Sequence, residues 1–180
     1  MNLNKKKGLN KEEKKFWQKH FRIEKMEQIS NFWNSLTRID SQEDDLFFYY
    51  ISLRVTSISE IHLKETLITD EGLKYITMFN NLKILYLRNH TKITKKSIPY
   101  FNQMKSLESL NITKTKITLT DLCEQLNNQN IKEVFLDSEE NENNILEKGF
   151  ILKTKMPNCN IYLNTSFTTE INGNIINPIF

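Results

Sequence analysis

The features of a membrane protein, a secreted protein or a nucleotide-binding enzyme are missing from this sequence of 180 residues. No stretch approaches the roughly 18 apolar residues that a membrane-spanning helix needs. The basic N-terminus, residues 1–7, is followed by no apolar run, so a secretory signal is not expected. Only four glycines occur, and none belongs to a phosphate-binding loop. We therefore expect a cytoplasmic protein with no membrane contact.

Cysteine and histidine are also scarce. Cys123 and Cys159 show no metal-ligand spacing, which favours two free thiols in a reducing compartment. The three histidines, His20, His62 and His90, are scattered, and neither cysteine has a base at motif spacing. We therefore predict no metal site, no cofactor and no enzymatic activity.

The length and the charge limit the possibilities further. One domain of this length buries roughly 70% of its unfolded surface, and its charged residues are spread along the chain rather than gathered in a disordered tail. The net charge of +3 is too small to indicate nucleic acid by itself.

What the sequence does contain is a repeat. Four segments share the pattern apolar-x-x-apolar-x-apolar. The second apolar position of this pattern falls at 61, 85, 110 and 134, so it advances by 24, 25 and 24 residues. The four copies read Ile58-x-x-Ile61-x-Leu63, Leu82-x-x-Leu85-x-Leu87, Leu107-x-x-Leu110-x-Ile112 and Ile131-x-x-Val134-x-Leu136. Each predicts a short strand, and a Pro-containing segment, 156–163, predicts a closing strand.

A helix is expected after each strand. Thr69, Thr94 and Thr118 suit N-caps, because a threonine hydroxyl accepts a free backbone N–H of the first turn. Thr118 with Asp121 also forms a capping-box pattern. The expected helices are about 71–79, 96–104, 120–127 and 144–154.

These residues resemble the leucine-rich repeat family, and the segment 68–73 resembles its cysteine-containing, ribonuclease-inhibitor-like class. The resemblance implies an α/β fold, a right-handed solenoid with a parallel sheet of four or five strands and an N-terminal helical cap. The buried Asn or Cys that the family carries after each strand is replaced by Thr66, His90 and Thr115. We therefore expect a less regular backbone ladder at that turn.

The region before the repeats is predicted to be helical. Apolar residues recur at helical spacing over 11–29, and 30–36 and 44–54 are interpreted as two further helices that cap the solenoid. The predicted organisation is a flexible N-terminus (1–10), a helical cap (11–57), the repeats (58–163) and a C-terminal extension (164–180) that can extend an edge of the sheet.

Strand alternation predicts a partner-binding surface. If Ile61 and Leu63 point inward, the intervening side chains face the concave surface of the sheet, and an aromatic-rich column runs across the repeats. Aromatic anchors are typical of interface hot spots. The alternative is that the tail or the N-terminal segment covers this face. The predicted protein-binding residues are His62, Lys64, Tyr86, Arg88, Asn111, Thr113, Phe135, Asp137 and Tyr162.

The loops beside this column predict a rim whose charge changes sign. Its basic part is Lys64, Arg88, His90, Lys92, Lys95, Lys96, Lys114 and Lys116, and its acidic part is Asp137, Glu139, Glu140 and Glu142. Solvated loops explain such runs equally well, whereas a bipolar rim would orient a protein partner. Nucleic acid is not expected, because the basic stretch has few aromatic residues and is bounded by acids.

The predicted function is stoichiometric protein binding by a protein that is monomeric when free. The specific hypothesis is a bacterial immunity protein that neutralises a cognate toxin by occlusion, by analogy with inhibitor-like repeats. The alternative is a scaffold or assembly factor for a multi-subunit complex. It rests on a layout, helices followed by few repeats, that is similar to the mitochondrial ATP synthase coupling factor B group.

Overall fold

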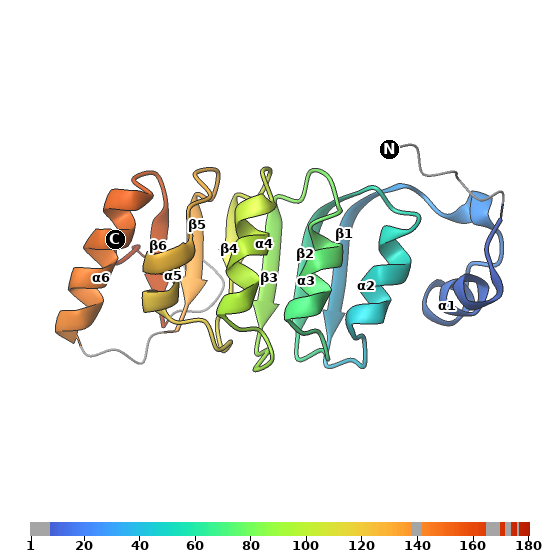
Figure 1. Cartoon of the computed structure of the whole chain (residues 1–180), viewed down its shortest axis with the longest axis horizontal. Helices are drawn as coiled ribbons and strands as arrows, with labels where there is room; N and C mark the ends of the chain where they lie inside the picture. Colours follow the sequence, from blue (N-terminus) through green and yellow to red (C-terminus); the bar gives the residue numbers. More distant parts are fainter. Residues whose placement is uncertain (1–7, 138–141, 165–169, 172–173, 176) are drawn as a thin grey trace.

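One parallel sheet organises the molecule. A computed structural model describes residues 8–137, 142–164, 170–171, 174–175 and 177–180 of the chain. Figure 1 shows the strands side by side behind a single row of helices, so one face of the sheet packs on helices and the other, the helix-free face, does not. The sheet has six strands in sequence order: β1 (Phe32–Ile39), β2 (Ser57–Lys64), β3 (Ile84–Arg88), β4 (Ser109–Asn111), β5 (Glu133–Leu136) and β6 (Asn160–Leu163).

The helices follow the strands as the repeat predicts. Thr69, Thr94 and Thr118 all act as N-caps, and Thr118 with Asp121 forms the expected capping box. The helical segments are α1 (Lys11–Phe21), α2 (Asp45–Ser52), α3 (Asp70–Ile76), α4 (Ile98–Gln103), α5 (Leu119–Gln125) and α6 (Glu142–Lys155), with short 3₁₀ turns η1 (Met26–Gln28) and η2 (Lys95–Ser97).

The core lies between the sheet and the helices. The repeat positions Ile61, Leu85, Leu110, Val134 and Ile161 pair across consecutive strands and are all completely buried. The predicted inward orientation of these positions is therefore confirmed. Since alternate residues of a strand face opposite sides, the register also fixes which side chains reach the helix-free face.

The prediction of a helix over 30–36 is wrong. This segment begins β1, in which Trp33 pairs with Ile58 and Leu36 pairs with Ile61. Leu36 lies 25 residues before Ile61 and is 3% exposed, so it occupies the same inward position as the repeat leucines. Pairing with β2 therefore decides the conformation of this segment, although its aromatic residues have helical spacing. The sheet consequently has six strands rather than four or five.

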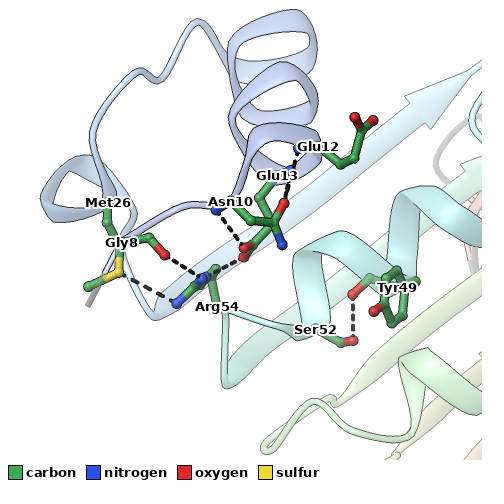
Figure 2. Close-up of polar contacts among 8 residues, drawn as sticks. All are labelled: Gly8, Asn10, Glu12, Glu13, Met26, Tyr49, Ser52 and Arg54. Atoms are coloured by element: carbon green, nitrogen blue, oxygen red, sulfur yellow. Dashed lines mark hydrogen bonds and ion pairs between the residues drawn. The ribbon is translucent and has the colours of Figure 1, made fainter. Parts of the chain in front are cut away.

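The helix α1 lies beyond β1 at the end of the array (Figure 1). It is fixed by aromatic contacts, such as Phe16 stacked on Tyr50 with ring centroids 4.9 Å apart. It is also fixed by an ion pair in which the Arg54 Nε donates to Glu13 Oε1 at 2.6 Å, while the Glu13 side chain is 2% exposed (Figure 2). Asn10 and Glu13 form a capping box that orients this carboxylate.

Two sets of polar contacts tie neighbouring repeats together near the helix N-termini. Asp45 accepts hydrogen bonds from the backbone and hydroxyl of Thr69, at 2.8 and 2.7 Å. Asp70 accepts the same pair from Thr94, at 2.8 and 2.7 Å, and a third bond from the buried Ser97 hydroxyl. We call these the Asp–Thr staples. In the next repeat the position of Asp70 is taken by Lys95, and no third staple forms there.

The turn after each strand is more regular than expected in the first repeats. The backbone N–H groups of Asp40, Glu65 and Asn89, all at positive φ, donate to a carbonyl of the next repeat at 2.9, 3.2 and 3.0 Å. At Lys114 the ladder changes, since its N–H donates to the side chain of Asp137 instead. Among the turns that the structure describes after β1, β2, β3 and β4, the expected irregularity is found at the fourth.

The C-terminal residues meet the far edge of the sheet. Ile161 of β6 donates its N–H to Phe180 O at 3.0 Å and accepts from Ile179 N at 2.9 Å. The predicted edge extension is confirmed for these last residues. A two-stranded antiparallel ladder, β7 (Glu170–Ile171) with β8 (Asn174–Ile175), precedes them.

Candidate partner-binding groove

A shallow groove of about 270 Å³ lies on the helix-free face over β1, β2 and β3. Four predicted binding residues, His62, Lys64, Tyr86 and Arg88, come together in its lining. Three residues of β1 complete the wall, and Leu63 also contributes. The full lining is Ser35, Thr37, Ile39, His62, Leu63, Lys64, Tyr86 and Arg88.

The centre of the groove is an aromatic pair. His62 and Tyr86 are register partners, and their rings meet edge to face with centroids 4.8 Å apart. The His62 Nε2 lies 3.2 Å from Glu60 Oε2, which fixes the imidazole toward its own strand. Burial raises the pKa of the Tyr86 hydroxyl above its ordinary value, so it stays protonated and can donate a hydrogen bond at physiological pH.

The upper rim of the groove carries paired charges. The Lys64 Nζ lies 3.3 Å from Glu65 Oε1 and 3.8 Å from Asp40 Oδ1. Asn89 donates to Glu65 at 2.7 Å and holds the pKa of that carboxyl below its ordinary value. The rim is thus a balanced network rather than a purely basic strip.

The second half of the predicted column is buried, which corrects the expectation that it is exposed. Phe135 and Tyr162 are register partners that stack with centroids 4.6 Å apart and an interplanar angle of 11°, and they are 1% and 5% exposed. Each ring covers one face of the other. The alternative prediction, that the tail covers this face, depends on the side chains of 165–176, which lie outside the described residues.

Asn111 and Thr113 are also buried, at 0% and 5% exposure. The Asn111 Oδ1 accepts from the backbone and the hydroxyl of Thr113, at 3.0 and 2.8 Å. Both side chains therefore close the end of their own strand instead of facing a partner. The last of the nine predicted residues, Asp137, is half-buried, and its carboxylate accepts a hydrogen bond from Lys114 N at 2.7 Å.

One residue of the predicted basic rim, His90, is buried, and most of the predicted acidic rim is not tested. His90 is 2% exposed, and burial lowers its pKa below the ordinary value, so it contributes no positive charge. Its Nε2 accepts from Thr66 N at 3.2 Å, so the His90 side chain ties the turn after β3 to the turn after β2. Of the predicted acidic rim, Glu139 and Glu140 and the Glu142 side chain lie outside the described residues.

Sequence reasoning missed Ser35, Thr37 and Ile39, because it predicts a helix over 30–36 and assigns 37–43 to no element. The signal that finds them is the repeat itself. Extending the period one step before Ile61 reaches Leu36 and places its odd-numbered neighbours on the helix-free face.

The residues that the structure describes contain neither a metal-binding cluster nor a reactive thiol. Within the described parts of the chain, no group of three or more His, Cys, Asp or Glu side chains could hold a metal ion. Both cysteines are free, and burial raises the pKa of Cys159 to about 12 and also raises that of Cys123. Such thiols are protonated at neutral pH and are poor nucleophiles. No described helix is long and apolar enough to cross a bilayer.

No protein-family model matches the chain. Over 106 residues, or 51% of this chain, the sequence is 28% identical to Leucine-rich repeat-containing protein 42 of Rattus norvegicus, and the same values hold for the Mus musculus protein. This similarity suggests the leucine-rich repeat family. The match covers 25% of each relative, so the chain corresponds to about a quarter of their length, and it does not define the class of repeat.

Proposed function

We propose that this chain is a protein-binding repeat protein whose partner contacts the groove over β1, β2 and β3. One observation carries the proposal. The groove is lined by accessible side chains, with Lys64 38% and His62 30% exposed, whereas Phe135 on the same face is 1% exposed. An aromatic centre with a polar rim is the usual anatomy of a protein interface. In this role the chain binds a protein partner and has no catalytic activity.

The architecture that presents the groove is proposed to be a right-handed leucine-rich repeat solenoid with α1 as its N-terminal cap. Parallel strands joined by a crossover are right-handed in about 98% of cases. The 24-residue spacing, the six parallel strands and the similarity to two leucine-rich repeat proteins support the family. The contacts of Phe16 and Glu13 with the α2 region support a capping role for α1.

Two specific roles fit a binding groove. Neutralisation of a cognate toxin by occlusion remains our specific hypothesis, for a monomeric protein in the cytoplasm. A scaffold is the alternative, and a second exposed surface favours it. Leu146, Phe150 and Ile151 of α6 are 45%, 65% and 50% exposed, and a scaffold needs a site for a second partner.

The test is affinity capture from the native cell followed by mass spectrometry, with three forms of the full chain as bait. We expect a stoichiometric partner with the unchanged protein and a loss of about tenfold or more with Tyr86→Ala. Tyr49→Ala is the matched control, because Tyr49 is an exposed aromatic residue of α2, on the helix side of the sheet.

The pattern of recovery separates the roles. A single protein whose activity is blocked on binding supports neutralisation, and a multi-subunit complex supports a scaffold. Equal recovery with Tyr86→Ala and the unchanged protein would overturn the groove as the binding surface.

A further inference from the structure

The sheet is closed at one edge and open at the other. At β6, the described residues Ile179 and Phe180 hydrogen bond to Ile161. At β1, all strand pairing goes to β2, and within the described parts of the chain no backbone group pairs with its outer edge. An edge strand that is neither paired nor covered is a template for another strand.

The backbone groups at this open edge belong to the residues that line the groove. Asp40 N donates to Lys64 O, so in the later part of β1, which lines the groove, Leu36 and Arg38 also point their backbone toward β2. Backbone direction alternates along a strand, and the N–H and C=O groups of Ser35, Thr37 and Ile39 therefore point outward. The Arg38 guanidinium donates to Thr37 O at 2.8 Å, so a strand added at this edge would share that carbonyl with Arg38.

The same three residues direct their side chains into the groove. A strand added at this edge would extend the helix-free face by one row, with alternate side chains beside Ser35, Thr37 and Ile39. β1 contains no proline, and its single charged residue is Arg38, whose guanidinium lies over the rings of Phe21 and Phe47. The edge and the groove thus form one continuous surface.

The charge next to the edge indicates what kind of strand fits. The exposed side of α1, which lies at the same end of the molecule (Figure 1), carries Lys11, Lys14, Lys15 and Lys19 against one exposed acid, Glu12. The acids beside β1 itself, Asp40 and Glu60, lie close to Lys64 and His62. A second copy of this chain would bring an equally basic α1 to the same place, which like-charge repulsion disfavours. A segment flanked by acidic residues is electrostatically complementary.

We propose that β1 binds an extended, acidic-flanked segment of another protein, which adds as a seventh strand to the sheet and lies along the groove. Main-chain hydrogen bonds to Ser35, Thr37 and Ile39 hold the segment, and its alternate side chains contact the groove. The inference rests on the proposed function and specifies how the partner is held.

The test uses a fluorescent peptide of alternating valine and threonine with two glutamates at each end, titrated against the full chain. Thr37→Pro removes one outward N–H and places a ring at the edge, and it leaves the bonds to β2 in place. Thr37→Val is the matched control, because it keeps the N–H. We expect saturable binding that Thr37→Pro weakens about tenfold or more and Thr37→Val preserves. The same peptide with lysines in place of glutamates should bind more weakly.

A second measurement does not depend on any variant. On addition of the acidic peptide to the unchanged protein, amide exchange should slow at Ser35, Thr37 and Ile39, while Asp40, already bonded, should change little. No binding up to about 1 mM, or binding without protection at these three amides, would overturn the inference.

If a cellular partner is nevertheless captured and lost with Tyr86→Ala, the groove proposal stands without the edge. If the peptide binds at the edge while capture is unaffected by Tyr86→Ala, the groove proposal fails instead.

Discussion

Over β1–β3 the helix-free face carries a groove lined mostly by exposed and half-buried side chains, whereas over β4–β6 the corresponding column is buried. The two halves also differ in what holds their repeats together. In the first half, the Asp–Thr staples join Asp45 to Thr69 and Asp70 to Thr94 near the helix N-termini. In the second half, Phe135 stacks on Tyr162 on the helix-free face itself.

This difference indicates when a repeat array can leave its sheet surface free for a partner. Where the staples join the repeats at the helix ends, the His62 and Tyr86 rings meet edge to face on the sheet surface but stay half-buried. Where Lys95 replaces the staple aspartate, Asn102 of α4 donates to Gln125 O at 2.8 Å and accepts from Asn127 N at 2.9 Å. Further along the array, the stacked rings of Phe135 and Tyr162 join β5 to β6 on the sheet surface. The same column of residues is therefore a candidate binding surface in one half and core in the other.

The largest expected effect tests the buried half. Phe135→Ala should lower the free energy of unfolding by about 3–5 kcal/mol, because it removes a buried ring and the stacking contact that this ring makes with Tyr162. Tyr86→Ala, at the equivalent position of the open half, should cost only about 1 kcal/mol. Urea denaturation of both variants measures the difference. Equal losses would mean that the two halves are not built differently.

The next effect tests the staples. Asp70→Ala should cost about 2 kcal/mol, since it leaves the Thr94 N–H and the buried Ser97 hydroxyl without their acceptor. Lys95→Ala is the matched control one repeat later and should change stability by less than about 0.5 kcal/mol. Thermal melting of the two variants suffices. Similar melting temperatures would show that the staples do not hold the first half together.

The strand positions and the helix caps could be predicted from sequence because each repeat states them again. Ile61 and Leu85 differ by one period, and Thr69 and Thr94 mark helix starts by their chemistry. The edge strand β1 could not be recognised in the same way, because Arg38 stands where Leu63 stands in the next repeat. Its guanidinium lies 5.4 and 5.2 Å from the ring centroids of Phe21 and Phe47, contacts that only the folded cap supplies.

The candidate site was predictable in register but not in exposure. Alternation placed Tyr86 and Phe135 on one face correctly, since strand direction fixes side-chain direction. It could not show that Phe135 stacks under Tyr162 or that the Asn111 oxygen is used by Thr113. Exposure depends on contacts between residues far apart in sequence, and the pattern within one strand does not contain them.

A smaller effect concerns the turn above the open half. Burial holds the pKa of His90 below its ordinary value of 6.5, and its Nε2 must stay unprotonated to accept from Thr66. Below about pH 6.5 the unfolded chain takes up a proton before the folded one does, so stability falls with decreasing pH until the folded-state pKa is passed. The negative charge of Glu65 raises the pKa of His90, but the lowering by burial is the larger effect.

The measurement is urea denaturation between about pH 7.5 and 5 for the unchanged protein and for His90→Asn. An asparagine oxygen can accept the same bond and does not titrate, so His90→Asn should show a weaker loss of stability on acidification. His20, whose pKa burial also lowers, is present in both proteins and leaves a common background. Identical pH dependence in the two proteins would mean that His90 titrates as freely as in the unfolded chain.

The smallest effect separates the rim of the groove from its centre. Lys64→Ala should change stability by less than about 1 kcal/mol, because its ion pairs with Asp40 and Glu65 are partly exposed and screened by salt. Its effect on a captured partner should be a few-fold decrease in association rate that disappears at high salt, whereas Tyr86→Ala should raise the dissociation rate at any salt concentration. Surface plasmon resonance at two ionic strengths distinguishes the two. A salt-independent loss of tenfold or more with Lys64→Ala would move the centre of the contact from the aromatic pair to the rim.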